Sequence, residues 1–272
     1  MINRSASGVI DLLRGIYAIR KRWEGASDDE VEIWFRGVGS CKYTLIPGAY
    51  RKPELDEESM GNEFEQRSPS YFDREPTDEW DWYFLMQHYR LPTRLLDWSE
   101  SPLVALFFAL DSWKQDRATT RARRLPGPCV WMLEPGSLNL ISTDNVDNAP
   151  IVPPGKFSNH WLLRQCGYGK PVATFEFEGK TYTNALPLAI MPKRREPRIL
   201  AQQGMFTVHG ASRDALESVV ASDRRGRIAC IRLEKPASPG WRDDLRTLGV
   251  FRAALFPEPD SIALDLRDRY EA

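Results

Sequence analysis

One stretch of the chain constrains the fold more than any other, because it is apolar on nearly every side of a helix. Ser101 is a favourable N-cap, and Pro102 suits the first helical position. The sequence LVALFFALDSW then fills residues 103–113. A helix that is apolar all round has to be covered on several faces. The sequence therefore predicts a buried central helix surrounded by other elements.

The size and charge of the chain limit what surrounds that helix. The chain has 272 residues, 42% of them hydrophobic, which suits one large domain or two small ones. Lys and Arg total 37 against 38 for Asp and Glu, so the net charge is −1. This balance excludes a globally basic nucleic-acid coat and a polyanionic tail as explanations of the whole chain.

The sequence gives no sign of export or membrane insertion. The longest strongly apolar run, residues 102–110, is shorter than the roughly 20 residues of a membrane span. The N-terminal residues lack the apolar segment of a secretory signal. Cys41, Cys129, Cys166 and Cys230 are far apart and form no C-x-x-C pair, which is typical of a reducing compartment. We expect a cytoplasmic protein with no membrane partner.

Several catalytic and metal-binding signatures are missing from the sequence. It contains no G-x-S-x-G, Walker A, G-x-G-x-x-G or H-E-x-x-H segment. The three histidines, His88, His160 and His209, are too few for a dedicated polyhistidine centre. We predict no metal site, and the sequence leaves open only a magnesium site built from carboxylates.

The remaining pattern intersperses helices and strands without a regular βαβ rhythm. Residues 31–36 alternate as a strand, and Gly37 either ends it or lets the backbone pass a neighbour closely. Other strands are expected at 129–134, 188–191, 204–209 and 227–233, with a hairpin over 172–183. Helices are expected at 9–23, 76–89, 212–221 (capped by Ser212), 239–248 and from Asp260 onward. Residues 54–65 form a surface helix or loop, 114–128 an exposed loop and 135–170 an irregular segment, while 90–100 shows no period.

These elements predict an α+β fold with a mixed or mostly antiparallel sheet and flanking helices. We expect one domain over residues 1–272. Its N-terminal half, about 10–113, carries most of the motifs, and its C-terminal half, about 129–268, completes the same domain.

Two segments of the N-terminal half carry candidate functional groups. Arg36 faces away from the apolar side of its strand and precedes Gly37, so it is either a phosphate clamp or an ordinary salt-bridged sheet residue. Residues 86–98 hold an imidazole, a hydroxyl, a guanidinium and a carboxylate next to the buried helix. Buried polar groups need partners, so this segment is an internal network in which Arg94 pairs with Asp97, or a pocket floor, or both.

Two further segments lie in the C-terminal half. Gln202 and Gln203 precede Gly204 at a strand entrance, where they form either a turn or a site for a sugar hydroxyl or base edge. Glu176 and Glu178 share a strand face, which suits acid–base chemistry or plain solvent exposure. Short basic segments at 114–124, 193–198 and 224–227 suit phosphate contacts.

Together, these segments resemble the FRG domain family, which is named after an N-terminal Phe/Tyr-Arg-Gly motif. The motif is Phe35-Arg36-Gly37 here, and the longest match is the run from Gln87 to Ala109. The segment 198–206 and Leu255-Phe256-Pro257 fit the same pattern, so the resemblance extends from about residue 10 to 268. FRG domains are bacterial and phage-associated and largely uncharacterised.

The motif order is also similar to that of ADP-ribosyltransferases, which present an arginine, a hydroxyl residue before a helix, and a glutamate or glutamine. This resemblance implies an ADP-ribosyltransferase-like fold with NAD as substrate. Its catalytic candidates are Arg36, at the NAD pyrophosphate or ribose site, Thr93, at the hydroxyl motif, and Gln202, at the third motif. Candidates for substrate or nucleotide binding are Gly37, Gln87, His88, Tyr89, Arg94, Asp97, Gly204 and Phe206.

Gln202 departs from this pattern because an amide supplies no negative charge to stabilise a developing cation. Either Glu176 or Glu178 fills the acidic role, or activity is low, or the pocket binds a nucleotide without cleaving it. The leading hypothesis is an NAD-using ADP-ribosyltransferase-like toxin or phage-defence effector with a protein or nucleic-acid target. It predicts that Arg36, Thr93 and Gln202 converge on one cleft.

Two alternatives remain. One is a nucleic-acid-binding or nuclease module with Arg94, Asp97 and the basic loop 114–124 along a groove. The other is a non-catalytic nucleotide-binding or interaction domain, in which the same motifs form core and scaffold.

Overall fold

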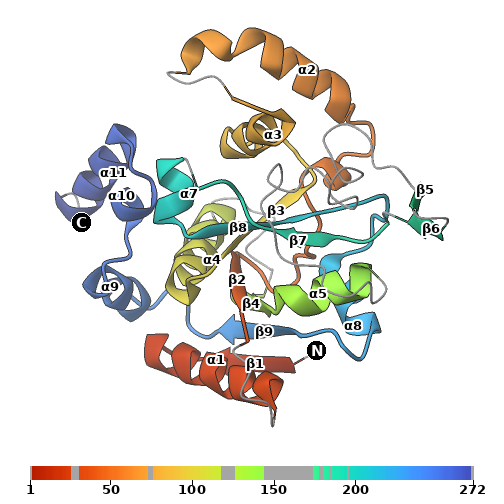
Figure 1. Ribbon diagram of the computed structural model, residues 1–272. Helices are drawn as coiled ribbons and strands as arrows, with labels where there is room; N and C mark the ends of the chain where they lie inside the picture. Colours follow the sequence, from red (N-terminus) through yellow and green to blue (C-terminus); the bar gives the residue numbers. More distant parts are fainter. Residues whose placement is uncertain are drawn as a thin grey trace.

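Seven strands of the described chain form one mixed sheet, to which both halves of the sequence contribute (Figure 1). The computed structural model describes residues 2–25, 31–72, 76–117, 126–143, 174–177, 180–183, 185–194 and 196–270. The strands are β1 (Ile2–Ala6), β2 (Trp34–Val38), β3 (Leu95–Ser99), β4 (Cys129–Leu133), β7 (Leu188–Ile190), β8 (Gly204–Val208) and β9 (Ile228–Leu233). Their order is β1-β9-β4-β2-β3-β8-β7; β1 pairs in parallel with β9, and the other neighbours pair antiparallel. The predicted α+β class is confirmed.

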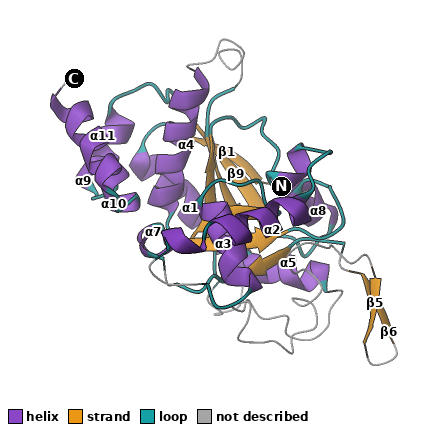
Figure 2. Cartoon of the chain, turned by 90° about the horizontal axis from the view of Figure 1, so that it is seen from above, coloured by secondary structure: helices purple, strands orange, loops and turns teal. Residues whose placement is uncertain are grey.

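Helices cover both faces of this sheet, and a separate hairpin of β5 (Thr174–Phe177) and β6 (Lys180–Thr183) projects from it (Figure 2). The longer helices are α1 (Val9–Glu24), α2 (Glu57–Arg67), α3 (Glu79–His88), α4 (Pro102–Arg117), α5 (Pro135–Ser142), α8 (Leu216–Ser222), α9 (Gly240–Thr247) and α11 (Pro259–Tyr270). Short helical turns are η1 (Ala49–Arg51), η2 (Pro69–Tyr71), α7 (Pro197–Ala201) and α10 (Arg252–Leu255).

Strand β4 shows how the two faces are built, because its residues alternate between two hydrophobic cores. Val130 and Met132 pack into a core with α1, α4 and α9. Cys129, Trp131 and Leu133 pack into the opposite core with α5 and α8. A third cluster joins α3 to β7 and β8. The side-chain period of two in a strand thus places β4 in the middle of three layers.

Helix α4 is the buried central helix that the sequence predicts. Its first turn is capped by the Ser101 hydroxyl, which accepts a hydrogen bond from the Val104 N–H at 3.4 Å. Ala105 and Ala109 are almost completely buried in the core that α4 shares with β2. Small residues on this side of the helix allow its backbone to lie close to the strand.

Gly37 is the position where α4 and β2 come closest. A Cβ atom built on Gly37 would lie 1.8 Å from the Ala105 carbonyl oxygen and 2.5 Å from the Ala109 nitrogen. Strand β2 continues past Gly37 to Val38. The sequence left two roles open for Gly37. It does let the backbone pass a neighbour closely, but it does not end the strand.

The sheet opens between β2 and β3. All five residues of β2 pair with β4, whereas only Phe35 pairs with β3, at Ser99. Strand β3 in turn pairs along its whole length with β8. The two central strands therefore separate beyond one residue pair.

Several elements differ from the sequence prediction. Strand β3 lies in the segment for which no period was found, and β1 was not predicted. Helix α5 occupies part of a segment expected to be irregular. The sequence does carry signals for its start: the Glu134 carboxylate accepts from the Ser137 N–H at 2.9 Å, and Pro135 is the first helical residue. Ser212 does not cap α8, because Ala215 is the N-cap and Ser212 hydrogen-bonds Asp214.

Some predictions fall on parts of the chain that are not described. Helix α4 extends to Arg117, into the expected loop, and residues 118–125 of that loop lie outside the described residues. So do residues 144–173, with His160 and Cys166, and Glu178 at the turn of the expected hairpin. None of the described helices has both the length and the apolar character needed to cross a membrane.

A buried polar network holds α2, α3 and the end of β8 together. The Arg94 side chain, 1% exposed, donates to Glu57 at 2.9 Å and to the His209 carbonyl oxygen at 3.0 Å. The Tyr83 hydroxyl donates to the second Glu57 oxygen and accepts from the Arg94 N–H at 2.7 Å. Such a desolvated ion pair is tolerated when further hydrogen bonds accompany it, as those of Tyr83 and of the His209 carbonyl oxygen do here.

His209 lies in the same region without such partners. It is completely buried, and neither ring nitrogen has a hydrogen-bond partner in the described part of the chain. Burial, with smaller contributions from Arg36 and Arg94, lowers the pKa of His209 to about 3. The imidazole is therefore neutral in the folded protein at physiological pH.

Replacement of Gly37 by Ala is expected to destabilise the protein by about 3 kcal/mol, because the new methyl group meets helix backbone that cannot move aside. The free energy of unfolding in urea measures this loss. Gly240→Ala at the start of α9 is the matched control, since its Cβ would meet nothing closer than 3.8 Å. Equal stability of the two variants would contradict the close packing of α4 on β2.

His209 makes stability depend on pH. Its pKa is lower in the folded chain than the ordinary 6.5, so the unfolded chain binds a proton first as the pH falls. Its contribution is complete above pH 6.5 and is lost progressively toward pH 3. Between pH 7 and pH 5 we expect the wild type to lose about 2 kcal/mol more unfolding free energy than His209→Phe. Equal losses in denaturant titrations at the two pH values would contradict this account.

Candidate functional site

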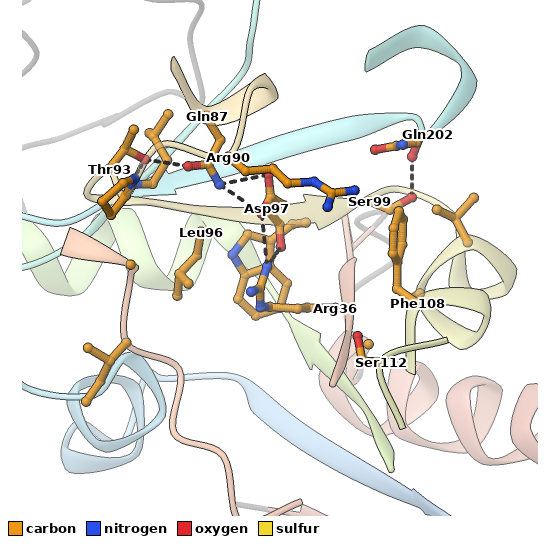
Figure 3. Close-up of a pocket in the computed structure, with 18 of the residues that line it drawn as sticks. Arg36, Gln87, Arg90, Thr93, Leu96, Asp97, Ser99, Phe108, Ser112 and Gln202 are labelled. Atoms are coloured by element: carbon orange, nitrogen blue, oxygen red, sulfur yellow. Dashed lines mark hydrogen bonds and ion pairs between the residues drawn. The ribbon is translucent and has the colours of Figure 1, made fainter. Parts of the chain in front are cut away.

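A pocket of about 540 Å³ lies where β2 and β3 separate (Figure 3). Phe35, Arg36 and Gly37 line it from β2, and the whole of β3 lines it from the opposite strand. Helix α4, helix α7, the end of α3 and the segments 46–52 and 90–93 complete its walls. The opening in the sheet is thus the base of the pocket.

Four residues are linked across this base by hydrogen bonds and one ion pair. The Thr93 hydroxyl donates to the Gln87 side-chain oxygen. Gln87 Nε2 donates to both carboxylate oxygens of Asp97, at 2.9 and 3.1 Å. Arg36 Nη1 lies 3.6 Å from Asp97 Oδ2 and donates to the Asp97 main-chain oxygen (Figure 3). The carboxylate is therefore held from two sides, while the Asp97 side chain remains 58% exposed.

Arg36 links the two strands that the backbone leaves unpaired. Its guanidinium spans from β2 to a main-chain oxygen of β3, where a sheet would ordinarily place an N–H. Its Nε is buried and has no hydrogen-bond partner among the described residues. Burial lowers the pKa of Arg36, and the Asp97 carboxylate opposes this by raising it. Arg36 is thus both a strand link and a cation in the pocket wall.

The pocket is strongly cationic. Besides Arg36, its described lining contains Arg51, Lys52, Arg90 and Arg198, against the single carboxylate of Asp97. None of these four has a carboxylate within ion-pair distance in the described ranges. An excess of unpaired cations in a concave site favours an anionic ligand.

Arg198 is placed by the C-terminal part of the chain. Its guanidinium stacks 4.5 Å from the centre of the Phe256 ring, and its Nη1 donates to the His88 carbonyl oxygen at 3.5 Å. Burial lowers the pKa of Arg198; Asp97 raises it and Arg90 lowers it further. Asp97, Arg90 and Arg198 line the same pocket.

The three catalytic candidates all line this pocket, but two of them use their side chains within the fold. The Thr93 residue is 1% exposed and its hydroxyl serves Gln87. Gln202 Nε2 donates to the Leu255 carbonyl oxygen at 3.1 Å. The hydroxyl that ends β3 directly ahead of α4 is Ser99, which donates to the Gln202 carbonyl oxygen at 2.7 Å.

Of the binding candidates, Gly37, Gln87 and Asp97 line the pocket and the others lie elsewhere. Arg94 pairs with Glu57, so the expected Arg94–Asp97 pair is wrong; Asp97 instead pairs with Arg36.

The remaining candidates lie in the surrounding structure. Gly204 lies in β8, where Phe206 packs 5.0 Å from Phe84 between ring centres. Tyr89 is 54% exposed and packs against His88, whose pKa is lowered by burial and by Arg198.

Neither glutamate considered for the acidic role is among the described residues that line the pocket. Glu176 lies on the β5–β6 hairpin, which is not part of the pocket wall, and Glu178 lies outside the described residues. Asp97 is the carboxylate that faces the pocket. Within the described ranges, no group of three or more His, Cys, Asp or Glu side chains is arranged to hold a metal ion.

Sequence reasoning did not single out several residues of the wall. Arg51 and Lys52 come from a segment with no recognisable motif, so only the fold brings them to the pocket wall. Phe108 lies in the predicted apolar helix, but its period did not mark it as a pocket residue. Arg90 lies within the conspicuous segment 86–98, and Ser99 directly follows it. For Arg90, the signal was available: it stands directly after a predicted helix, where its charge faces the helix C-terminus.

The family comparison fits this architecture. Residues 31–118 match the family model of the FRG domain, from just before β2 to just after α4. Searches of curated proteins and of solved structures gave no match. The wider extent expected, from about residue 10 to 268 in one domain, remains a prediction. Residues 31–118, with the Arg36–Asp97 side of the pocket, are an FRG domain.

Proposed function

We propose that this pocket binds NAD and that the protein is an ADP-ribosyltransferase-like enzyme. The observation that carries the proposal is the composition of the wall, whose described residues include five cationic side chains around one carboxylate. Arg and Lys side chains are the usual partners of phosphate groups. A dinucleotide such as NAD has two phosphates. When the bond between its nicotinamide and ribose breaks, positive charge develops on ribose C1. One ligand therefore matches both the cations and the carboxylate.

The other lining residues are suited to the uncharged parts of such a ligand. Phe108, Leu91 and Leu96 offer apolar surface for a base or nicotinamide ring. Ser112 offers a hydroxyl group to a sugar. The cavity volume of about 540 Å³ is in the range of small-molecule sites.

Asp97 is the residue we assign to the charged step. In the reaction, the bond between the nicotinamide nitrogen and ribose C1 breaks, and its electron pair leaves with nicotinamide. An acceptor oxygen or nitrogen then bonds to C1 and gives its proton to water. A carboxylate that Gln87 and Arg36 hold in place stabilises the positive charge on C1 without reorganising. We assign this role to Asp97 and not to Gln202, because the Gln202 amide donates to the Leu255 carbonyl oxygen.

An activity of this kind would consume NAD or modify a macromolecule in the cell that contains it. Either effect suits a toxin or a phage-defence effector. The acceptor is a protein or a nucleic acid, and labelled NAD in a bacterial lysate would identify it.

Nicotinamide release by the purified protein tests the proposal. We expect Asp97→Asn to lose at least about 100-fold in release rate, since it removes the charge and keeps the shape. Asp244→Asn, at an exposed carboxylate on α9 outside the pocket, is the matched control and should retain full activity. Thermal unfolding of both variants shows whether the fold is kept.

The outcomes separate the candidate functions. Loss of release in a folded Asp97→Asn protein supports the transferase. Binding of NAD without nicotinamide release, with or without lysate, would leave a non-catalytic nucleotide-binding domain. Absence of NAD binding would refute both readings of the pocket.

A further inference from the structure

Arg90 has a backbone conformation that its side chain disfavours. Its φ is +64°, in the left-handed region, where glycine is the usual residue. It follows the Tyr89 C-cap of α3: the Arg90 N–H bonds the Gln87 oxygen at 3.0 Å, and the Leu91 N–H bonds the Met86 oxygen at 2.9 Å. This is the Schellman arrangement, and Arg90 occupies its glycine position.

The backbone conformation at this position therefore favours glycine over arginine. A residue with a Cβ atom in the left-handed region strains the helix end, and such strain is typical of functional sites. The side chain makes no ion pair with any residue in the described ranges that would offset the strain. What the arginine adds is a positive charge at the pocket.

The direction of the side chain supports this interpretation. Figure 3 shows Arg90 lying above Asp97 and extending toward Ser99 across the pocket. Arg90 is exposed, whereas Arg198 on the other side is partly buried against Phe256. Both guanidiniums line the same pocket, and the charge of Arg90 lowers the pKa of Arg198. An anion placed between them would remove their repulsion.

We propose that Arg90 binds a phosphate group of the nucleotide and determines the preference of the pocket for a phosphorylated ligand. This inference rests on the proposed function, because it assigns part of the same ligand. Arg90 is a binding residue in this account, and Asp97 remains the residue at the reacting carbon. The strained backbone is kept because the guanidinium is needed at the pocket.

The variant Arg90→Gly separates the backbone effect from the side-chain effect. We expect its melting temperature to rise by about 2 °C, because glycine relieves the left-handed strain. We also expect its affinity for ADP-ribose to fall at least about tenfold, as measured by calorimetry, while binding of adenosine is unchanged. Arg90→Lys, which keeps the charge, should retain part of the affinity.

Lys235→Gly is the matched control. Lys235 is exposed, has a φ of +46° in the turn after β9 and does not line the pocket. It should gain stability in the same way and keep its affinity for ADP-ribose. A change in ADP-ribose binding by this control would overturn the assignment, since strain alone would then explain the result.

The remaining outcomes distinguish the two levels of the proposal. Full ADP-ribose affinity in Arg90→Gly would overturn the role of Arg90 and leave the nucleotide pocket intact. A lower melting temperature together with weaker binding would make Arg90 structural and also overturn it. If the wild type binds inorganic pyrophosphate through Arg90 but binds no ADP-ribose, the phosphate role holds and the nucleotide proposal fails. If it binds neither probe, both fail.

Discussion

The close approach of α4 to β2 at Gly37 is the constraint on which the rest of the molecule depends. Without a side chain at this position, the helix backbone lies against the strand, and Ala105 and Ala109 face it with the smallest side chains available. This contact fixes the height of α4 above the sheet. It also brings Val104 and Phe108 to one side of the opening between β2 and β3. The Phe-Arg-Gly segment therefore combines a packing requirement at Gly37 with a chemical group at Arg36.

The pocket exists because β2 and β3, at the centre of the sheet, share only one backbone pair. Beyond the Phe35–Ser99 pair, side chains take over the link between the two strands: Arg36 spans to the Asp97 backbone, and Gln87 holds the Asp97 carboxylate from the other side. The opening that results is the base of the pocket. Asp97 is exposed at the pocket, whereas Arg94, three residues earlier, is buried in an ion pair with Glu57.

The sequence predicts the layers of this fold better than it predicts the site. Period and capping signals locate α1, α4, β4 and β9, because each buries apolar residues at regular spacing. They miss β1, an edge strand with little of its surface buried, and β3, whose residues are buried on both faces except at Asp97. The grouping of Arg36, Gln87, Thr93 and Asp97 was expected, since these residues belong to conspicuous motifs. Their ion-pair partners were not predicted. Arg94 pairs with Glu57 and leaves Asp97 to Arg36, because of where α2 packs, and no local sequence pattern encodes that packing.

The register of β2 also has a consequence for how this chain can be divided. Its five backbone pairs are with β4, which lies beyond residue 118, while its sequence neighbour β3 supplies only one. A fragment cut at the limits of the family match would keep both strands but lose most of the hydrogen bonds that hold β2. Its exposed N–H and C=O groups would be free to pair with other chains. The boundary of the recognisable sequence is therefore not a boundary at which the protein can be cut and still fold, and aggregation is the expected fate of the isolated segment.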